Sequence, residues 1–241
     1  VGQLAETYVT FLNSAGTAAS GFEYDWSYMS YSLAANYELS DDMAVFGSIS
    51  KGSRVNADRL GDGGFYSNGT AADGSVENEL TSFEFGAKVD EDDYSLFATV
   101  FYVETDDVNS ESTNANGGAR VRGYESTGLE LEASTKIGEI DLRGSMTWTD
   151  AEIVSSNDAT IIGNTPRRQA DFVWSLSPSY QFGDHYVGAT LIGTTDSYSQ
   201  DNNAYTMDGY TYINLFADFA LAPGLKLQMS VNNVTDQIGI T

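Results

Sequence analysis

Apolar and polar residues alternate with a period of two along most of the chain. Between residues 129 and 137, leucine, alanine and isoleucine mostly occupy one set of alternate positions, and glutamate, serine and lysine occupy the other. The same alternation runs through 140–148, 211–221 and 225–231. Successive side chains of a strand point to opposite faces of a sheet, so the pattern predicts strands with one apolar and one polar face.

Eleven segments of this kind follow one another. They are 3–12, 23–38, 43–54, 79–89, 94–105, 121–137, 139–152, 169–182, 185–197, 208–221 and 225–235. Many exceed the roughly 9 to 11 residues that a tilted strand needs to cross the hydrocarbon layer of a membrane. They also exceed the roughly five or six residues typical of globular sheets. The segments therefore predict an all-β protein whose strands can span a bilayer.

The connections between the segments are alternately short and long. The short ones are Ser40–Asp42, Asp90–Asp93, Gly138, Gly183–Asp184 and Ala222–Gly224, and the long ones are about 13–22, 55–78, 106–120, 153–168 and 198–207. Short periplasmic turns and long outside loops are typical of an antiparallel up-and-down transmembrane β-barrel. A soluble sandwich with crossover connections has no reason to keep this alternation.

The placement of the cationic residues agrees with a barrel. A lysine or arginine facing lipid at mid-membrane costs about 2 to 4 kcal/mol, so cations should be absent there. The polar positions of the strands hold Lys88, Lys136, Arg143 and Lys226. Lys51 falls on the apolar positions, and we expect a bulge or the membrane interface to accommodate it beside a long loop.

Composition narrows the possible partners and chemistry. No apolar run is long enough for a membrane helix, and the mean hydropathy is -0.27, which suits strands with a polar lumen face. A net charge of -24 argues against nucleic acid as a partner. The absence of cysteine excludes a disulfide framework and a thiolate metal site.

Several motifs, in a fixed order, resemble those of the TonB-dependent outer-membrane receptors. They are residues 37–60, Glu79–Leu80 with Phe85–Lys88, Phe101–Tyr102, Gly128–Glu132, Gly163–Arg168, Pro178–Tyr180, Gly209–Thr211 and Val231–Asp236. The last is close to the Asn-Asn-Leu-Thr-Asp signature of the penultimate strand. The resemblance implies a 22-stranded barrel, of which residues 1–241 would supply about eleven strands, without the plug domain and the final strand.

The resemblance also implies a function and a location. We expect a bacterial outer-membrane receptor that imports a scarce solute, such as a siderophore–iron complex or an oligosaccharide, energised by TonB through the missing plug region. Lipid and lipopolysaccharide would be its other partners. Two alternatives stay open: a passive porin, and a soluble β-rich adhesin whose apolar faces pack on each other.

Nothing in the sequence indicates catalysis or a cofactor. The lone His185 beside a short turn has no recognisable nucleophile and acid around it. Glu130 and Glu132 alternate with leucine, which favours a lumen wall over acid–base chemistry. Acidic turns such as Asp90–Asp93 contain oxygen ligands that suit Ca²⁺, but without the spacing of a calcium loop they are better interpreted as solvated turns.

The basic residues concentrate where we expect the outer rim and loops. Of 11 lysines and arginines, seven lie there: Lys51, Arg54, Arg59, Arg120, Arg122, Arg167 and Arg168. The six arginines, together with Tyr66, Tyr198 and Tyr205, are the predicted ligand-binding residues. Arginine forks suit an anionic solute or lipopolysaccharide phosphates, and tyrosines can stack on rings. The alternative is that the arginines pair with loop carboxylates such as Asp58, Asp62 and Glu111.

Overall fold

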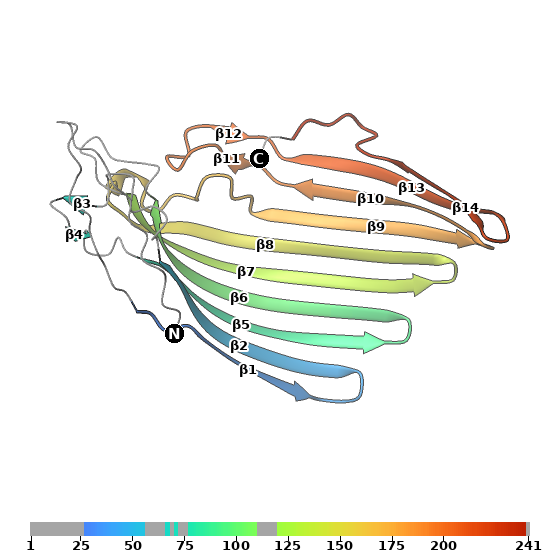
Figure 1. Cartoon of the computed structure of the whole chain (residues 1–241), viewed down its shortest axis with the longest axis horizontal. Coiled ribbons are helices and arrows are strands. Elements are labelled where there is room, and N and C mark those ends of the chain that lie inside the picture. Colours follow the sequence, from blue (N-terminus) through green and yellow to red (C-terminus); the bar gives the residue numbers. More distant parts are fainter. Residues whose placement is uncertain (1–26, 56–65, 68–69, 72–76, 110–119, 240–241) are drawn as a thin grey trace, which may run out of the picture.

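The computed structural model describes residues 27–55, 66–67, 70–71, 77–109 and 120–239. Ten strands form one antiparallel sheet in the order β1-β2-β5-β6-β7-β8-β9-β10-β13-β14 (Figure 1). The order of these ten strands in the sheet is the same as their order along the chain. Their bounds are β1 Tyr31–Glu38, β2 Met43–Val55, β5 Glu77–Glu91, β6 Tyr94–Asn109, β7 Arg120–Ile137, β8 Ile140–Ser156, β9 Phe172–Phe182, β10 His185–Thr194, β13 Tyr210–Ala222 and β14 Leu225–Val231. The predicted up-and-down topology is confirmed.

These ten strands correspond, in order, to ten of the eleven predicted segments, and segment 3–12 lies outside the described residues. Four short strands were not predicted: the pair β3 (Tyr66–Ser67) and β4 (Thr70–Ala71), and the pair β11 (Ser197–Tyr198) and β12 (Thr206–Met207). The structure differs from the prediction at several strand ends: β6 and β8 each run four residues further, and β9 and β10 are each three residues shorter at the long-loop end. β1 begins only at Tyr31, and β14 stops at Val231, where the chain leaves the ladder at an asparagine pair.

The register separates the strand residues into an apolar face and a polar face. One continuous row, for example, joins Leu33, Ile49, Phe83 and Tyr102 across four strands. On β8 the apolar face is uncharged from Ile140 to Trp148. At about 3.3 Å per residue and a tilt of about 40°, this stretch spans about 20 Å of membrane thickness, close to the roughly 25 Å apolar band of membrane barrels.

The polar face is the more crowded of the two. Ala44, Ser82, Gly86, Gly128 and Ser179 are buried, and the strand register places all five on this face. Large side chains of the apolar face are exposed instead, as with Phe85 at 60% and Leu33 at 70%. A sheet that curves toward its polar face produces this difference, because side chains crowd on a concave surface. The polar residues therefore line the inside of the curve.

Lys51 is the one lysine on the apolar face within the described strands. Its ammonium group lies 2.9 Å from the carboxylate of Glu79 on the neighbouring strand β5, and both side chains are about one third exposed. The next residue of the apolar face along β2 is Ile49, two ladder positions away. Near the interface a lipid-facing cation costs about 0 to 1 kcal/mol, so the expectation of an interfacial lysine agrees with its position.

The sheet is open, with β1 and β14 as its two edges, and in the described ranges no second sheet covers the apolar face. The packed core is small and lies at the long-loop end, where Ile153 is fully buried and Ile161 is 5% exposed. The described residues contain no helix of the length and apolarity needed to cross a membrane. A sandwich with its apolar faces sealed together, as expected for the soluble adhesin, is not what these residues form.

Candidate functional site

Two loops at the long-loop end meet at Asp201, between β10 and β13. This carboxylate is 7% exposed. Its Oδ2 accepts a 2.5 Å hydrogen bond from Arg122 Nη1 of β7, and its Oδ1 accepts the backbone N–H of Arg167 at 3.0 Å, in the β8–β9 loop. Asn164 of the latter loop donates to the Asp201 carbonyl at 2.9 Å. One aspartate thus joins a strand end and two loops.

A second set of bonds ties the same two loops together. Asn203 is in the left-handed region at φ 53°, and its side-chain amide donates to the Thr165 carbonyl at 2.8 Å. Its Oδ1 accepts the Thr165 N–H at 3.1 Å. The backbone N–H of Arg168 donates to the Tyr198 carbonyl at 2.7 Å. We call residues 157–171 and 195–209 together the loop platform.

Arg122 connects the end of β7 to this platform through its ion pair with Asp201. Its side chain is 6% exposed, and Asp201 neutralises its charge. Arg122 lies beyond the apolar band, near the long-loop end of β7. Burial disfavours its charged form, but hydrogen bonding with Tyr124 and the charge of Asp201 outweigh burial and raise the pKa of Arg122 above its usual value. Its Nε has no hydrogen-bond partner among the described residues.

The remaining predicted ligand residues are placed differently from one another. The Arg167 side chain is 47% exposed, with Nε 3.9 Å from Asp201, and Arg168 is exposed in the left-handed region at φ 61°. Tyr205 is 67% exposed, Tyr198 is half-buried and Arg54 is exposed at the end of β2. Tyr66 is the first residue of β3 and Arg120 the first residue of β7, and Arg59 lies outside the described residues. The platform thus brings together Arg122, Arg167, Arg168, Tyr198 and Tyr205.

Sequence reasoning missed the residues that organise the platform. One alternative was that the arginines pair with loop carboxylates such as Asp58, Asp62 and Glu111, which lie outside the described residues. Arg122 does pair with a loop carboxylate, but with Asp201, which the sequence did not single out. The segment Asp201-Asn202-Asn203 has the composition of an ordinary polar turn. No signal in one sequence shows that its first residue meets an arginine 79 positions earlier.

Hydroxyl groups pair across the strands of the polar face below the platform. Oγ atoms lie 2.7 Å apart for Ser50 and Ser82, 2.7 Å for Ser95 and Ser134, and 2.8 Å for Ser145 and Ser175. Charged residues are interspersed with them. In the part of the chain that the structure describes, Lys88, Glu130, Glu132 and Arg143 form no ion pair. The polar face is therefore a hydrated wall with unneutralised charges of both signs.

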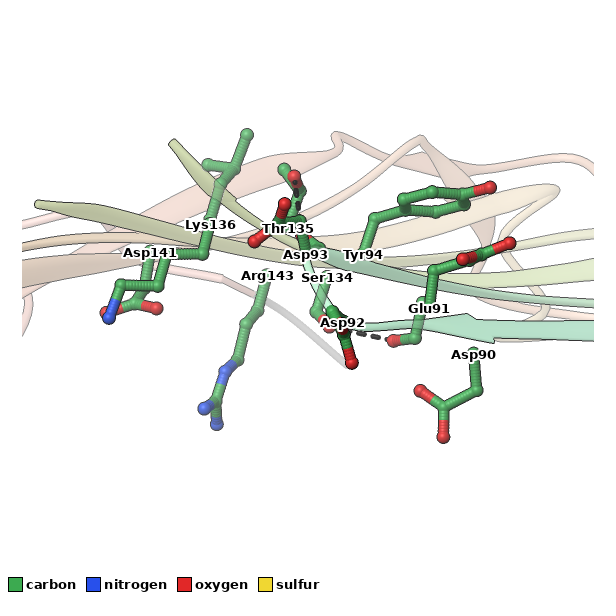
Figure 2. A pocket seen from close by; sticks show the side chains of 12 residues that line it. Asp90, Glu91, Asp92, Asp93, Tyr94, Ser134, Thr135, Lys136, Asp141 and Arg143 are labelled. Carbon is green, nitrogen blue, oxygen red and sulfur yellow. Dashed lines mark hydrogen bonds between the residues drawn. The ribbon is translucent and has the colours of Figure 1, made fainter. Parts of the chain in front are cut away.

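The short-turn end carries a hollow of about 260 Å³, lined mainly by acidic residues of the β5–β6 turn and by the β7–β8 hairpin (Figure 2). The Asp93 carbonyl accepts the Lys136 N–H at 2.9 Å and the Thr135 hydroxyl at 3.1 Å. Within the described residues no group of three or more acidic or imidazole side chains is arranged to hold a metal ion. The Asp93 carbonyl thus ties the β5–β6 turn to the end of β7.

His185, at the start of β10, has structural contacts. Its Nδ1 accepts the Ala220 N–H at 3.2 Å, and its ring lies 5.2 Å from that of Phe182 and 5.7 Å from that of Phe219. The imidazole ring thus lies between two aromatic neighbours at the short-turn end of the sheet.

One apolar and one polar face, an up-and-down topology and a loop platform at one end define this chain as the wall of a membrane β-barrel. The chain belongs to the TonB-dependent receptors: the family model described as "TonB dependent receptor-like, beta-barrel" matches residues 5–234. The predicted resemblance is confirmed. Relatives of this family are transport receptors of the bacterial outer membrane.

Individual relatives are distant and longer. The metal-pseudopaline receptor CntO of Pseudomonas aeruginosa is 24% identical over 214 residues, covering 83% of this chain and 28% of the relative. The siderophore receptor PiuA of Acinetobacter baumannii superposes with a TM-score of 0.70 at 18% identity, covering 93% of this chain and 34% of that one. The ferric citrate transporter FecA gives 0.73 at 17% identity, with coverages of 86% and 33%. The chain spans about a third of the length of these relatives, and the structural likeness shows the fold.

Proposed function

We propose that the receptor containing this chain imports a scarce metal chelate, such as a siderophore–iron complex, across the bacterial outer membrane. The observation that carries the proposal is a polar, charged concave wall lying below an ordered loop platform that exposes Arg167, Arg168 and Tyr205. The names of the relatives support the cargo class, since CntO is a metal-pseudopaline receptor and FecA a ferric citrate transporter.

The platform and its neighbours would make the first contact with the cargo. Exposed guanidinium groups can bind the acidic oxygens of a chelate, and tyrosine rings can cover its apolar parts. Arg54, Arg59, Tyr66, Arg120 and Arg122 complete the proposed binding set, with Arg122 acting from beneath the surface through Asp201. Replacing Arg167 and Arg168 together by glutamine would then weaken chelate binding.

The other partners follow from the two faces of the wall. The apolar face would contact outer-membrane lipid, and rim arginines would contact lipopolysaccharide phosphates. TonB would act through the plug region of the receptor. Uptake would therefore depend on TonB and on the inner-membrane proton gradient.

Uptake of iron-55 chelates by cells that express the intact receptor tests this function. We expect transport that stops when TonB is deleted or the proton gradient is collapsed. Transport that continues under both conditions would instead support a passive porin. Arg143→Gln, on the polar face near the short-turn end, is the matched control for Arg167→Gln with Arg168→Gln. Equal effects of the two changes would contradict a cargo role for the platform arginines.

A further inference from the structure

A tight turn of the loop platform carries two adjacent arginines. Arg167 and Arg168 are the one pair of neighbouring basic residues in the sequence. The Arg167 side chain is 47% exposed, and Arg168 is exposed as well. Exposed loops are where proteases cut folded proteins, and a protease with an acidic specificity pocket selects arginine. The side chains of this turn therefore have the chemistry of a cleavage site.

The backbone of this turn is strained at Arg168. The Gln169 N–H donates to the Pro166 carbonyl at 3.3 Å, and Arg168 is in the left-handed region at φ 61°. Glycine or asparagine usually occupies the left-handed position of a turn, because a β-carbon crowds the following carbonyl oxygen there. An arginine at this position relaxes when the turn opens. Contacts outside the turn therefore hold it closed.

Those contacts come from the loop between β10 and β13. The Arg168 N–H donates to the Tyr198 carbonyl at 2.7 Å, and the Arg167 N–H donates to Asp201 Oδ1 at 3.0 Å. Asn203 adds two bonds to the residue just before the turn. The buried ion pair with β7 fixes the Asp201 carboxylate itself. The backbone of the turn is thus held from one side while its arginine side chains are exposed.

The closed turn withholds its peptide bonds from a protease. A protease binds its substrate as an extended strand, through main-chain N–H and carbonyl groups. A left-handed residue is not extended, and the N–H groups of Arg168 and Gln169 are both already bonded. Their nitrogen atoms belong to the two peptide bonds that follow an arginine. The turn thus presents the side chains that a protease selects and hides the bonds that it cuts.

We propose that this turn is a latent cleavage site for an arginine-specific endoprotease, reached only when the loop platform opens. Cleavage adds water across the bond that follows Arg167 or Arg168: the hydroxyl group goes to the carbonyl carbon and the proton to the nitrogen. Water is the one reactant consumed. The site depends on the platform contacts and not on the identity of the cargo, so it goes beyond the proposed import function.

Cleavage at this turn leaves the wall of the barrel in place. The turn lies between β8 and β9, whose ladder runs from Ile140 opposite Tyr180 to Trp148 opposite Phe172. β8 also pairs with β7, and β9 also pairs with β10. Both pieces of a cut chain therefore stay in one sheet, while the platform loses the connection through its turn. Proteolysis changes the loops without dismantling the barrel.

Trypsin added to cells that express the intact receptor tests the proposal. N-terminal sequencing identifies the fragments that begin at Arg168 or Gln169. We expect the parent to yield these fragments slowly and Asp201→Asn to yield them at least about tenfold faster, because loss of one partner of a buried ion pair raises the open population that trypsin cuts. On gels the cut receptor should keep its folded mobility when unheated and release the fragments on heating.

A second variant and a control make the test independent of one substitution. Asn203→Gly removes the two bonds to Thr165, and glycine accepts the left-handed backbone there at φ 53°, so this variant should also be cut faster than the parent. Asp196→Asn, at an exposed carboxylate of the same loop, should be cut at the parental rate. Equal rates for the parent and Asp201→Asn, absence of the fragments from both platform variants, or acceleration by Asp196→Asn would each overturn the latent site.

Discussion

Asp201 binds Arg122 across 79 positions of the sequence, with less than a tenth of either side chain exposed. The pair connects a strand of the barrel wall to a loop two hairpins further along the chain. Because the same carboxylate also accepts the Arg167 N–H, a change at Asp201 affects three segments at once. The buried charge pair is therefore one of the contacts that hold the loop platform together, beside the bonds that Asn203 and Arg168 make between the same two loops.

Asp201→Asn is expected to loosen the platform without unfolding the wall. Removing one member of a buried ion pair leaves the other charge unpaired, at a cost of about 3 to 5 kcal/mol. The β5–β8 ladder does not depend on that carboxylate, so we expect faster cleavage of residues 195–209 by an added protease and an unchanged heat-modified gel mobility. The measurement is the cleavage rate in intact cells.

Asp196→Asn is the matched control, since Asp196 is in the same loop and exposed. Its cleavage rate should stay near that of the parent. Similar acceleration by both changes would show that loss of loop charge, and not loss of the buried pair, opens the platform.

Adjacent residues of β8 provide a test of which face meets lipid. Met146 lies on the apolar face and Ser145 on the polar face, where its hydroxyl is 2.8 Å from that of Ser175. Met146→Arg should destabilise the folded barrel by about 2 to 4 kcal/mol, because an arginine at mid-membrane faces hydrocarbon. Ser145→Arg should cost much less, since its side chain reaches water. Urea unfolding in lipid vesicles measures both, and equal costs would contradict the assignment of the faces.

The sequence predicts the wall well and the platform poorly, for a physical reason. Alternation along 129–137 or 225–231 reports directly which face each side chain takes, because a strand repeats every two residues. The bond between Asn203 and Thr165 depends on two loops meeting in space, and neither loop has a periodic pattern. The end of β14 could be predicted only in part. The sequence shows the two asparagines after Val231, but it does not show that the strand ladder ends there.

Gly128 is expected to tolerate no side chain. A Cβ there would overlap both the Phe101 ring and the Trp148 carbonyl oxygen, and the second of these belongs to the backbone of the neighbouring strand. Gly128→Ala should therefore cost about 1 to 3 kcal/mol in unfolding experiments, as overpacking does in other tightly packed sites. Gly52→Ala, where nothing lies within 4 Å of the new methyl group, should change stability little. A tolerated Gly128→Ala would mean that Phe101 moves away and leaves the ring–glycine contact dispensable.

Asn233 ends the regular pairing of β14 and is expected to set the path of the chain that follows. Its backbone is in the left-handed region at φ 50°, its Oδ1 accepts the Gln237 N–H at 3.0 Å, and its amide donates to the Gln237 carbonyl at 2.9 Å. Asn233→Ala loses both bonds and strains the backbone, whereas Asn233→Gly loses the bonds but accepts the conformation. Folding yield in vesicles should therefore fall in the order asparagine, glycine, alanine. Equal yields for Asn233→Gly and Asn233→Ala would show that the left-handed conformation contributes nothing. A yield for Asn233→Gly as high as that of the parent would show that the two side-chain bonds contribute nothing.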